Sequence, residues 1–110
     1  MRVPILIQHL NKDTRMWHDV ATVHAQVNKA SNGSQYLSSA SQQSNSNKVF
    51  KIRYAKQLSD IEYAMQHYRI IYKNTVFKIE DYDDFQEKHI NIELLGVSTG
   101  VKYKHWWISR

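Results

Sequence analysis

Period-two alternation of apolar and polar side chains is the feature that most constrains the fold of this 110-residue chain. It is clearest over about 11 residues ending at Val27, which is typical of a strand with one buried face. The apolar side consists of Trp17, Ala21, Val23, Ala25 and Val27, and the polar side of His18, Thr22, His24, Gln26 and Asn28. Ala21 and Ala25 leave a helix as the alternative, but the Val and Thr content favours a strand. Asp19 interrupts the apolar side, and we expect it near an edge.

Five more segments alternate in the same way. They are Val3–Gln8, Val49–Tyr54, Tyr68–Lys73, Val76–Tyr82 and Ile90–Leu95. In the second of these, Phe50, Ile52 and Tyr54 face one way and Val49, Lys51 and Arg53 the other. Six short strands separated by turn signals predict an antiparallel β-barrel or sandwich.

The connections between these strands are also predicted by their residues. Asn11–Thr14 and Asp83–Lys88 are polar enough to be turns, and Asn74 suits a tight hairpin between the fourth and fifth strands. Ser59 and Glu62 have capping-box spacing, so we expect a single helical turn or an irregular connection within Gln57–Gln66. We expect Gly96 to end the sixth strand. The fold class is therefore all-β, a small barrel of about six antiparallel strands with at most one short helix.

A polar segment, SNGSQYLSSASQQSNSN at residues 31–47, separates the second and third strands. Of its 17 residues, 14 are Ser, Asn, Gln or Gly, and none is charged. Such a composition cannot bury enough apolar surface to offset the entropy of ordering, so we expect a long disordered loop. Loops of this length inside a compact domain are often functional. A solvated surface loop is the alternative, because long loops cost little free energy.

Composition narrows the classes of protein to which the chain can belong. It has no Cys, which excludes a disulfide framework and a thiolate metal site, and it carries a net charge of +5, which favours acidic partners. The start, MRVPILIQHL, is too short in its apolar run for a signal peptide, and no apolar stretch is long enough to cross a bilayer. The cytosol, or a particle assembled there, fits this composition better than secretion does.

No catalytic site, cofactor site or metal site emerges from the residues. The six histidines are dispersed, and His18 and His24 on one strand would lie roughly 20 Å apart. The acidic residues Asp81, Asp83, Asp84 and Glu87 lack the spacing of a calcium loop and fit a solvated turn better. The three glycines form no phosphate-binding motif. We therefore do not expect an enzyme.

Nucleic-acid binding is the rival function from another class. Lysines and arginines on the third to fifth strands supply positive charge, and Tyr68, Tyr72, Trp106 and Trp107 could stack on bases. Tyr68 and Tyr72 lie on the apolar side of their strand, where core packing is the better interpretation. The basic, aromatic tail at residues 98–110 could equally dock on a partner. Its candidate docking residues are Lys102, Lys104, Trp106, Trp107 and Arg110.

The order of several local strings resembles the head completion, or stopper, proteins of long-tailed bacteriophages. Trp17–Val27 is similar to the family pattern W-x-D-V-A-T-V-x-A-x-V, Phe50–Lys56 to F-x-I-R-Y followed by a basic residue, and Arg69–Ile79 to R-I-x-Y-x-x-x-x-Y-x-I. The resemblance covers residues 3–97, so we expect one head-completion domain at 1–97. The chain departs from the pattern at Lys73-Asn74, where the family commonly has Asp-Gly, and at Phe77, where it has Tyr.

The resemblance implies a structural virion protein at the head–tail interface. Family members form a ring, usually dodecameric, beneath the portal and its adaptor, and are monomeric when isolated. Their partners would be the adaptor, a tail protein and the packaged double-stranded DNA. A tail terminator or another ring component of the connector is the neighbouring alternative.

The resemblance further implies that the loop at residues 30–48 gates the DNA channel. The residues that we expect to form the gate are Ser31, Asn32, Gly33, Ser34, Gln35, Tyr36, Leu37, Gln42, Gln43 and Asn45. Uncharged Ser, Asn and Gln can pair between copies around an axis without repelling one another. Tyr36 and Leu37 are the large apolar side chains that we expect at contacts between subunits.

Overall fold

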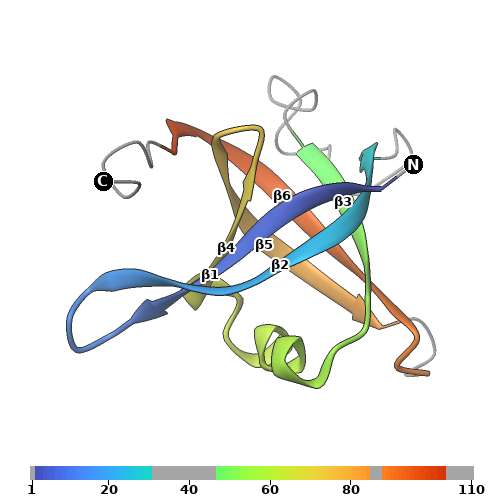
Figure 1. Cartoon of the computed structure of the whole chain (residues 1–110), viewed down its shortest axis with the longest axis horizontal. Helices are drawn as coiled ribbons and strands as arrows, with labels where there is room; N and C mark the ends of the chain where they lie inside the picture. Colours follow the sequence, from blue (N-terminus) through green and yellow to red (C-terminus); the bar gives the residue numbers. More distant parts are fainter. Residues whose placement is uncertain (1, 31–46, 85–87, 104–110) are drawn as a thin grey trace.

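The computed structural model of the chain describes residues 2–30, 47–84 and 88–103. Within these ranges the chain forms six strands and two 3-10 helices (Figure 1). The strands are β1 (Val3–Asn11), β2 (Met16–Lys29), β3 (Asn47–Arg53), β4 (Tyr68–Tyr72), β5 (Thr75–Asp84) and β6 (Asn91–Lys102). The helices η3 (Lys56–Tyr63) and η4 (Met65–His67) join β3 to β4. The predicted all-β fold is confirmed.

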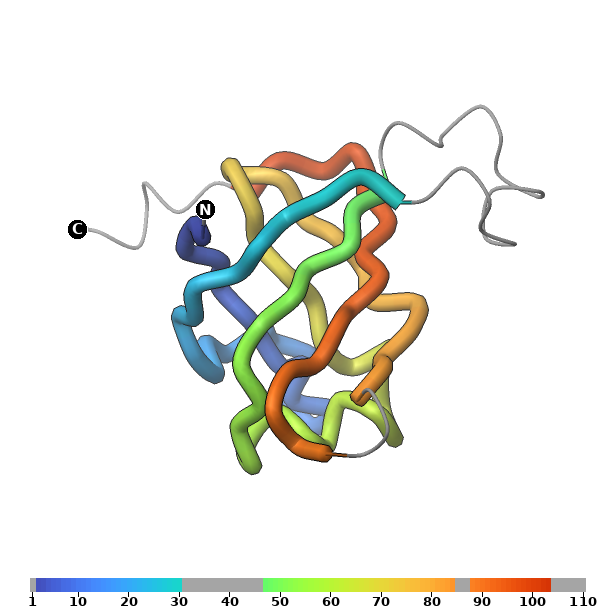
Figure 2. The backbone as a smooth tube through the Cα atoms, turned by 90° about the vertical axis from the view of Figure 1, so that its right-hand side faces the viewer, coloured from blue at the N-terminus to red at the C-terminus, as the bar shows by residue number. Residues whose placement is uncertain are grey.

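The strands close into a barrel rather than a sandwich. Figure 2 shows the strands wrapped around a common interior. They pair antiparallel in the order β1-β2-β3-β6-β5-β4, and β4 pairs back to β1 with Ile70 opposite Ile7. The pairing thus runs around the whole barrel, although β3 pairs with β2 only over residues 26–29 of β2.

The barrel interior is filled by the side chains that the alternation predicted to face inward. Ile5, Ile7, Phe50, Ile52, Ile70, Ile92 and Leu94 are almost completely buried. Leu58 and Ile61 of η3 are also fully buried and join the same core cluster. The connection between β3 and β4 is therefore part of the hydrophobic core and not a loose loop.

A β-bulge in β2 explains the position of Asp19. Ile7 pairs with Ala21 but the next residue, Gln8, pairs with Asp19, so Val20 is the extra residue on β2. The bulge reverses which residues face outward beyond it. Asp19 is consequently exposed although its position in the sequence belongs to the apolar side.

The connection between β4 and β5 is the tight turn that Asn74 predicted. Tyr72 pairs with Thr75 across a two-residue loop. Lys73 and Asn74 have φ values of 49° and 61°, the left-handed pair that a type I′ hairpin requires. Asn tolerates this conformation better than other non-glycine residues do.

The predicted helical turn is more extensive than expected, and the capping box is wrong. The 3-10 helix η3 begins at Lys56, with Ala55 before it and no side-chain cap. Ser59 lies inside η3, where its hydroxyl donates to the carbonyl of Lys56 at 2.7 Å. The hydroxyl thus bonds backward along the chain, and burial of Leu58 and Ile61 supplies the stabilisation that a cap would have given.

The predicted end of the sixth strand at Gly96 is wrong. β6 continues to Lys102 and pairs with β5 as far as Thr75, so residues 98–102 of the predicted tail are part of the sheet. Gly96 lies opposite Lys48 and Ile79, and a Cβ there would approach Phe50 Cε1 to 2.6 Å. Glycine at this position makes room for the Phe50 ring instead of ending the strand.

Two further boundaries also differ from expectation. β5 extends to Asp84, so the turn expected at residues 83–88 begins later than predicted. The sixth strand, predicted from Ile90, begins at Asn91, and Ile90 is 61% exposed.

The antiparallel order gives the barrel two distinct ends. One end, here called the loop end, gathers the start of β1, the end of β2, the start of β3, the β4–β5 turn and the end of β6 (Figure 1). The other end carries the β1–β2 turn, η3 and the β5–β6 connection (Figure 1). In the described part of the chain, no helix is long and apolar enough to cross a membrane.

Candidate functional site

The segment predicted to gate a channel is attached at the loop end. The candidate gate residues from Ser31 to Asn45 lie outside the described residues. The two flanks are held together, because the Ala30 amide donates to the Asn47 carbonyl at 3.3 Å. Lys29 and Lys48 form the last pair of the β2–β3 ladder. The segment therefore leaves and re-enters the barrel at neighbouring positions.

Five basic side chains lie at the loop end. They are Arg2, Lys29, Lys48, Lys73 and Lys102. The described residues of this end, at 2–4, 26–30, 47–49, 71–76 and 98–103, include no carboxylate side chain. Lys29 and Lys48 are directly opposite each other, and like charges in that arrangement repel. This end of the barrel therefore favours an anionic neighbour.

The predicted docking tail is only partly described. Lys102 lies at the end of β6, where its ammonium donates to the hydroxyl of Thr75 at 3.5 Å. Lys104, Trp106, Trp107 and Arg110 lie outside the described residues.

A second cluster was not predicted and is centred on Arg69 of β4. The Arg69 Nε donates to Gln8 Oε1 at 2.8 Å, and Gln8 Nε2 in turn donates to Asp19 Oδ1 at 2.8 Å. The Arg69 Cζ lies 4.3 Å from the centre of the Trp17 ring and 6.0 Å from that of Tyr103. Gln8 is only 3% exposed. The guanidinium is thus fixed in orientation by one hydrogen bond and two aromatic rings.

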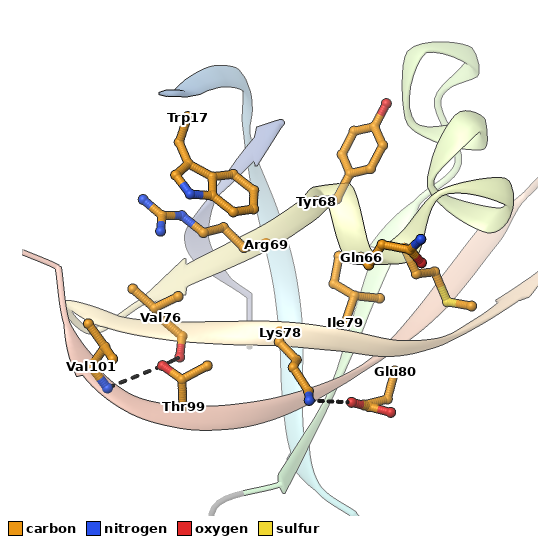
Figure 3. A pocket seen from close by; sticks show the side chains of 11 residues that line it. Trp17, Gln66, Tyr68, Arg69, Val76, Lys78, Ile79, Glu80, Thr99 and Val101 are labelled. Carbon is orange, nitrogen blue, oxygen red and sulfur yellow. Dashed lines mark hydrogen bonds and ion pairs between the residues drawn. The ribbon is translucent and has the colours of Figure 1, made fainter. Parts of the chain in front are cut away.

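The Arg69 cluster borders a groove on the outer face of the barrel (Figure 3). The groove has a volume of about 540 Å³ and lies between η4, β5 and the end of β6. Trp17 and Tyr68 line it together with Val76, Ile79 and Val101. Lys78 and Glu80 form an exposed ion pair along it at 3.2 Å. The groove is therefore mostly apolar, with the Arg69 guanidinium beside it.

The Arg69 guanidinium carries a charge that no described carboxylate balances directly. Among the residues that the structure describes, the ion pairs are Lys78–Glu80 and His89–Asp84, and neither includes Arg69. Burial lowers the pKa of Arg69, while Tyr103 acts in the opposite direction. Arginine remains protonated at neutral pH because its ordinary pKa is far above 7. The terminal nitrogens of Arg69 are consequently available to an acidic group from outside the subunit.

The strand alternation does not indicate how far Arg69 and Gln8 are covered by other side chains. Arg69 is only partly exposed because Trp17 and Tyr103 pack against it. Gln8 is covered because the bulge in β2 places Asp19 opposite it, and its side chain is hydrogen-bonded to Asp19, Arg69 and Tyr103. The sequence did contain one signal: Trp17, Asp19 and Arg69 all fall in the strings that resemble the phage family.

The tyrosines considered for base stacking belong to the core, as predicted. Tyr68 is 8% exposed and is part of the core cluster, and Tyr72 packs against that cluster and contacts Phe50 edge-on. Burial raises the pKa of Tyr68, with a further contribution from Asp60. Both rings therefore pack against the protein's own core side chains.

The titratable side chains do not assemble into a metal site in the described ranges. No group of three or more His, Asp or Glu side chains there could hold a metal ion. Asp84 accepts from the His89 amide at 3.0 Å and pairs with the His89 ring, so the end of β5 is joined to a residue shortly before β6.

Comparison with protein families decides the assignment. The model of the phage head completion protein family matches residues 9–95, which is most of the chain. The chain belongs to the phage head completion protein family. No individual curated protein matches it. A head completion protein is a structural component of the phage particle at the head–tail interface, and its partners are other head and tail components.

Proposed function

We propose that this head completion protein forms a ring at the head–tail connector and closes the DNA channel after packaging. In this proposal the β2–β3 segment of each subunit, from Ser31 to Asn45, reaches into the channel. The copies meet there, hold the double-stranded DNA in the head, and separate when the tail delivers it. The outer part of the ring provides the surface to which the tail attaches, and the opposite face rests on the adaptor below the portal.

The observation that carries the proposal is the position of the two flanks of this segment. Ala30 and Asn47 are hydrogen-bonded at the end of adjacent strands, so the barrel anchors both ends of the segment at one point. A polar segment held in this way can extend from the barrel without disturbing the core. A gate needs two arrangements that differ little in free energy, and an uncharged Ser, Asn and Gln segment meets this requirement.

The charge at the loop end supports the same orientation. The five basic side chains Arg2, Lys29, Lys48, Lys73 and Lys102 would face the DNA phosphates. The segment itself has no charge, so it would not adhere tightly to the DNA that must pass it. Basic residues around a neutral gate would attract DNA to the channel while leaving the gate free to open.

Electron microscopy of phage heads tests the ring directly. Heads should be purified with and without this chain, before tails are added, and averaged around the portal axis. The proposal predicts an added ring of small barrels below the portal, usually with twelve copies in this family, and monomers in the free protein. The absence of a ring from heads that contain the chain would rule the proposal out.

A further inference from the structure

The groove beside Arg69, here called the Arg69 groove, and an acidic patch on the same barrel are complementary in charge. The groove lies on β4, the first half of β5 and the last part of β6. The patch, here called the acidic ladder, consists of Asp83 near the end of β5 and Glu93 near the start of β6. The two surfaces share no residue, so a subunit can use both at once.

The carboxylates of the acidic ladder, like Arg69, have no ion-pair partner among the described residues of their own subunit. Asp83 and Glu93 are directly opposite each other in the β5–β6 ladder, an arrangement in which like charges repel. Lys51 of β3 lies opposite Glu93 on its other side, and Lys88 lines the same hollow. Neither lysine is in an ion pair with Asp83 or Glu93 among the described residues. Both carboxylates are exposed, and neither is in an ion pair within the part of the chain described by the structure. A cation from another molecule would relieve the repulsion between them.

We propose that the Arg69 groove receives the acidic ladder of a neighbouring copy of this chain, so that each contact around the ring joins these two surfaces. The inference rests on the ring put forward above and names its subunit interface. A closed ring requires a heterologous contact, in which two different complementary surfaces of each subunit meet those of its neighbours. A fixed guanidinium beside an apolar groove suits this contact, because an arginine paired with a carboxylate at an interface gives both strength and orientation.

The role of Trp17 follows from this assignment. The ring of Trp17 stacks on Arg69 and also lines the groove, so it holds the guanidinium toward the incoming carboxylates. Gln8 occupies Arg69 Nε, which leaves the terminal nitrogens for the partner. The cluster is thus organised before the neighbour arrives, which lowers the entropic cost of association.

Charge reversal on each surface separately tests the contact. Arg69→Glu alone and the pair Asp83→Lys with Glu93→Lys alone should each lower the fraction of heads that carry a ring by about tenfold or more, because every contact then opposes like charges. A matched control reverses two exposed carboxylates outside both surfaces, Asp13→Lys with Glu62→Lys, and should assemble like the wild type. Circular dichroism of each free subunit checks that the fold is retained.

An equal mixture of the two defective proteins provides the decisive result. In an alternating ring, the glutamate introduced into the groove of one variant would meet the lysines introduced into the ladder of the other. The native Arg69 of the ladder variant would meet the native carboxylates of the groove variant. Restoration of rings by the mixture, but by neither protein alone, is the expected result. If the ladder variant assembles as well as its control, or if the mixture fails, the assigned interface is wrong. If the wild type itself forms no ring, the proposed function fails instead.

If Arg69→Glu fails to fold, two milder variants replace the charge reversals. One is Arg69→Gln, and the other combines Asp83→Asn with Glu93→Gln. Each removes charge without reversing it, and each should weaken assembly in a way that high salt does not worsen further. Wild-type assembly should weaken with salt, because charge pairs that are partly exposed are screened. An equal salt response in all of these proteins would also overturn the assignment.

Discussion

The guanidinium of Arg69 lies 4.3 Å from the centre of the Trp17 ring, joining two strings that are 52 positions apart in the chain. A stack of this kind contributes about 0.5–1 kcal/mol at a partly exposed site. We predict that Trp17→Ala and Arg69→Ala are coupled by about that free energy in a double-mutant cycle of unfolding by urea. Lys78→Ala is the control, because Lys78 also lines the groove but pairs with Glu80, and it should show no coupling to Trp17→Ala.

Gly96 is predicted to be intolerant of any side chain. A Cβ at this position would lie 2.6 Å from Phe50 Cε1 and 3.3 Å from Phe77 Cβ. Overpacking of this kind usually costs about 1–3 kcal/mol, so Gly96→Ala should lower the free energy of unfolding by that amount. The smaller side chain in Phe50→Leu should recover part of the loss in the double variant. If the losses in unfolding free energy caused by Gly96→Ala and Phe50→Leu simply add in the double variant, the two residues do not compete for space.

Alkaline pH should destabilise the fold through Tyr82. Burial, followed by the charges of Asp84 and Glu62, raises the pKa of Tyr82 from 10.0 to about 12. The folded state therefore keeps this phenol neutral at a pH where the unfolded chain ionises it. Below pH 10 the phenol is neutral in both states and costs the fold nothing. As the pH rises from 10 toward 12, ionisation of Tyr82 in the unfolded chain lowers the free energy of unfolding. Denaturation of the wild type and Tyr82→Phe should give a stability difference that changes in favour of Tyr82→Phe above pH 10.

The opposed lysines at the base of the β2–β3 segment should have opposite effects on stability and on function. Lys29 and Lys48 form a directly opposite pair, and such repulsion costs roughly 0.2–1 kcal/mol. Lys48→Gln should therefore stabilise the free subunit slightly, as measured by urea denaturation. If these lysines face DNA, the same variant should make DNA escape from tailless heads more easily at low salt, and the difference from the wild type should shrink as salt screens the charges. Lys12→Gln in the exposed β1–β2 turn is the control and should change neither measurement.

Much of the fold follows from local sequence signals, and the exceptions have specific causes. The strand alternation placed Phe50, Ile52 and Ile70 in the core, and Asn74 indicated the tight hairpin. Gly96 was misread because glycine usually marks a strand end, whereas here it makes room for a ring from another strand. The ring is that of Phe50, which lies 46 positions before Gly96 in the chain, so no local sequence pattern contains this contact.

The Arg69 cluster could not be predicted for a similar reason. It needs the bulge at Val20 to set the positions of Asp19 and Trp17 relative to Gln8, and a one-residue bulge leaves no clear mark in the sequence. The candidate gate residues were selected by composition, and their role stays a prediction because they lie outside the described residues. The structure shows that the residues on either side of this segment, Ala30 and Asn47, are hydrogen-bonded to each other at the loop end of the barrel.

Retention of DNA by tailless heads is the most direct test of the gating role. Deletion of residues 34–46 leaves residues 31–33 to join Ala30 to Asn47, which is long enough for a hairpin connection. The β2–β3 ladder and the Arg69 groove are unchanged, so the variant should fold and should still form a ring. Heads carrying this ring should lose their packaged DNA, while heads carrying the wild-type ring keep it. Equal retention of DNA by the two kinds of head, with the ring present in both, would contradict the account.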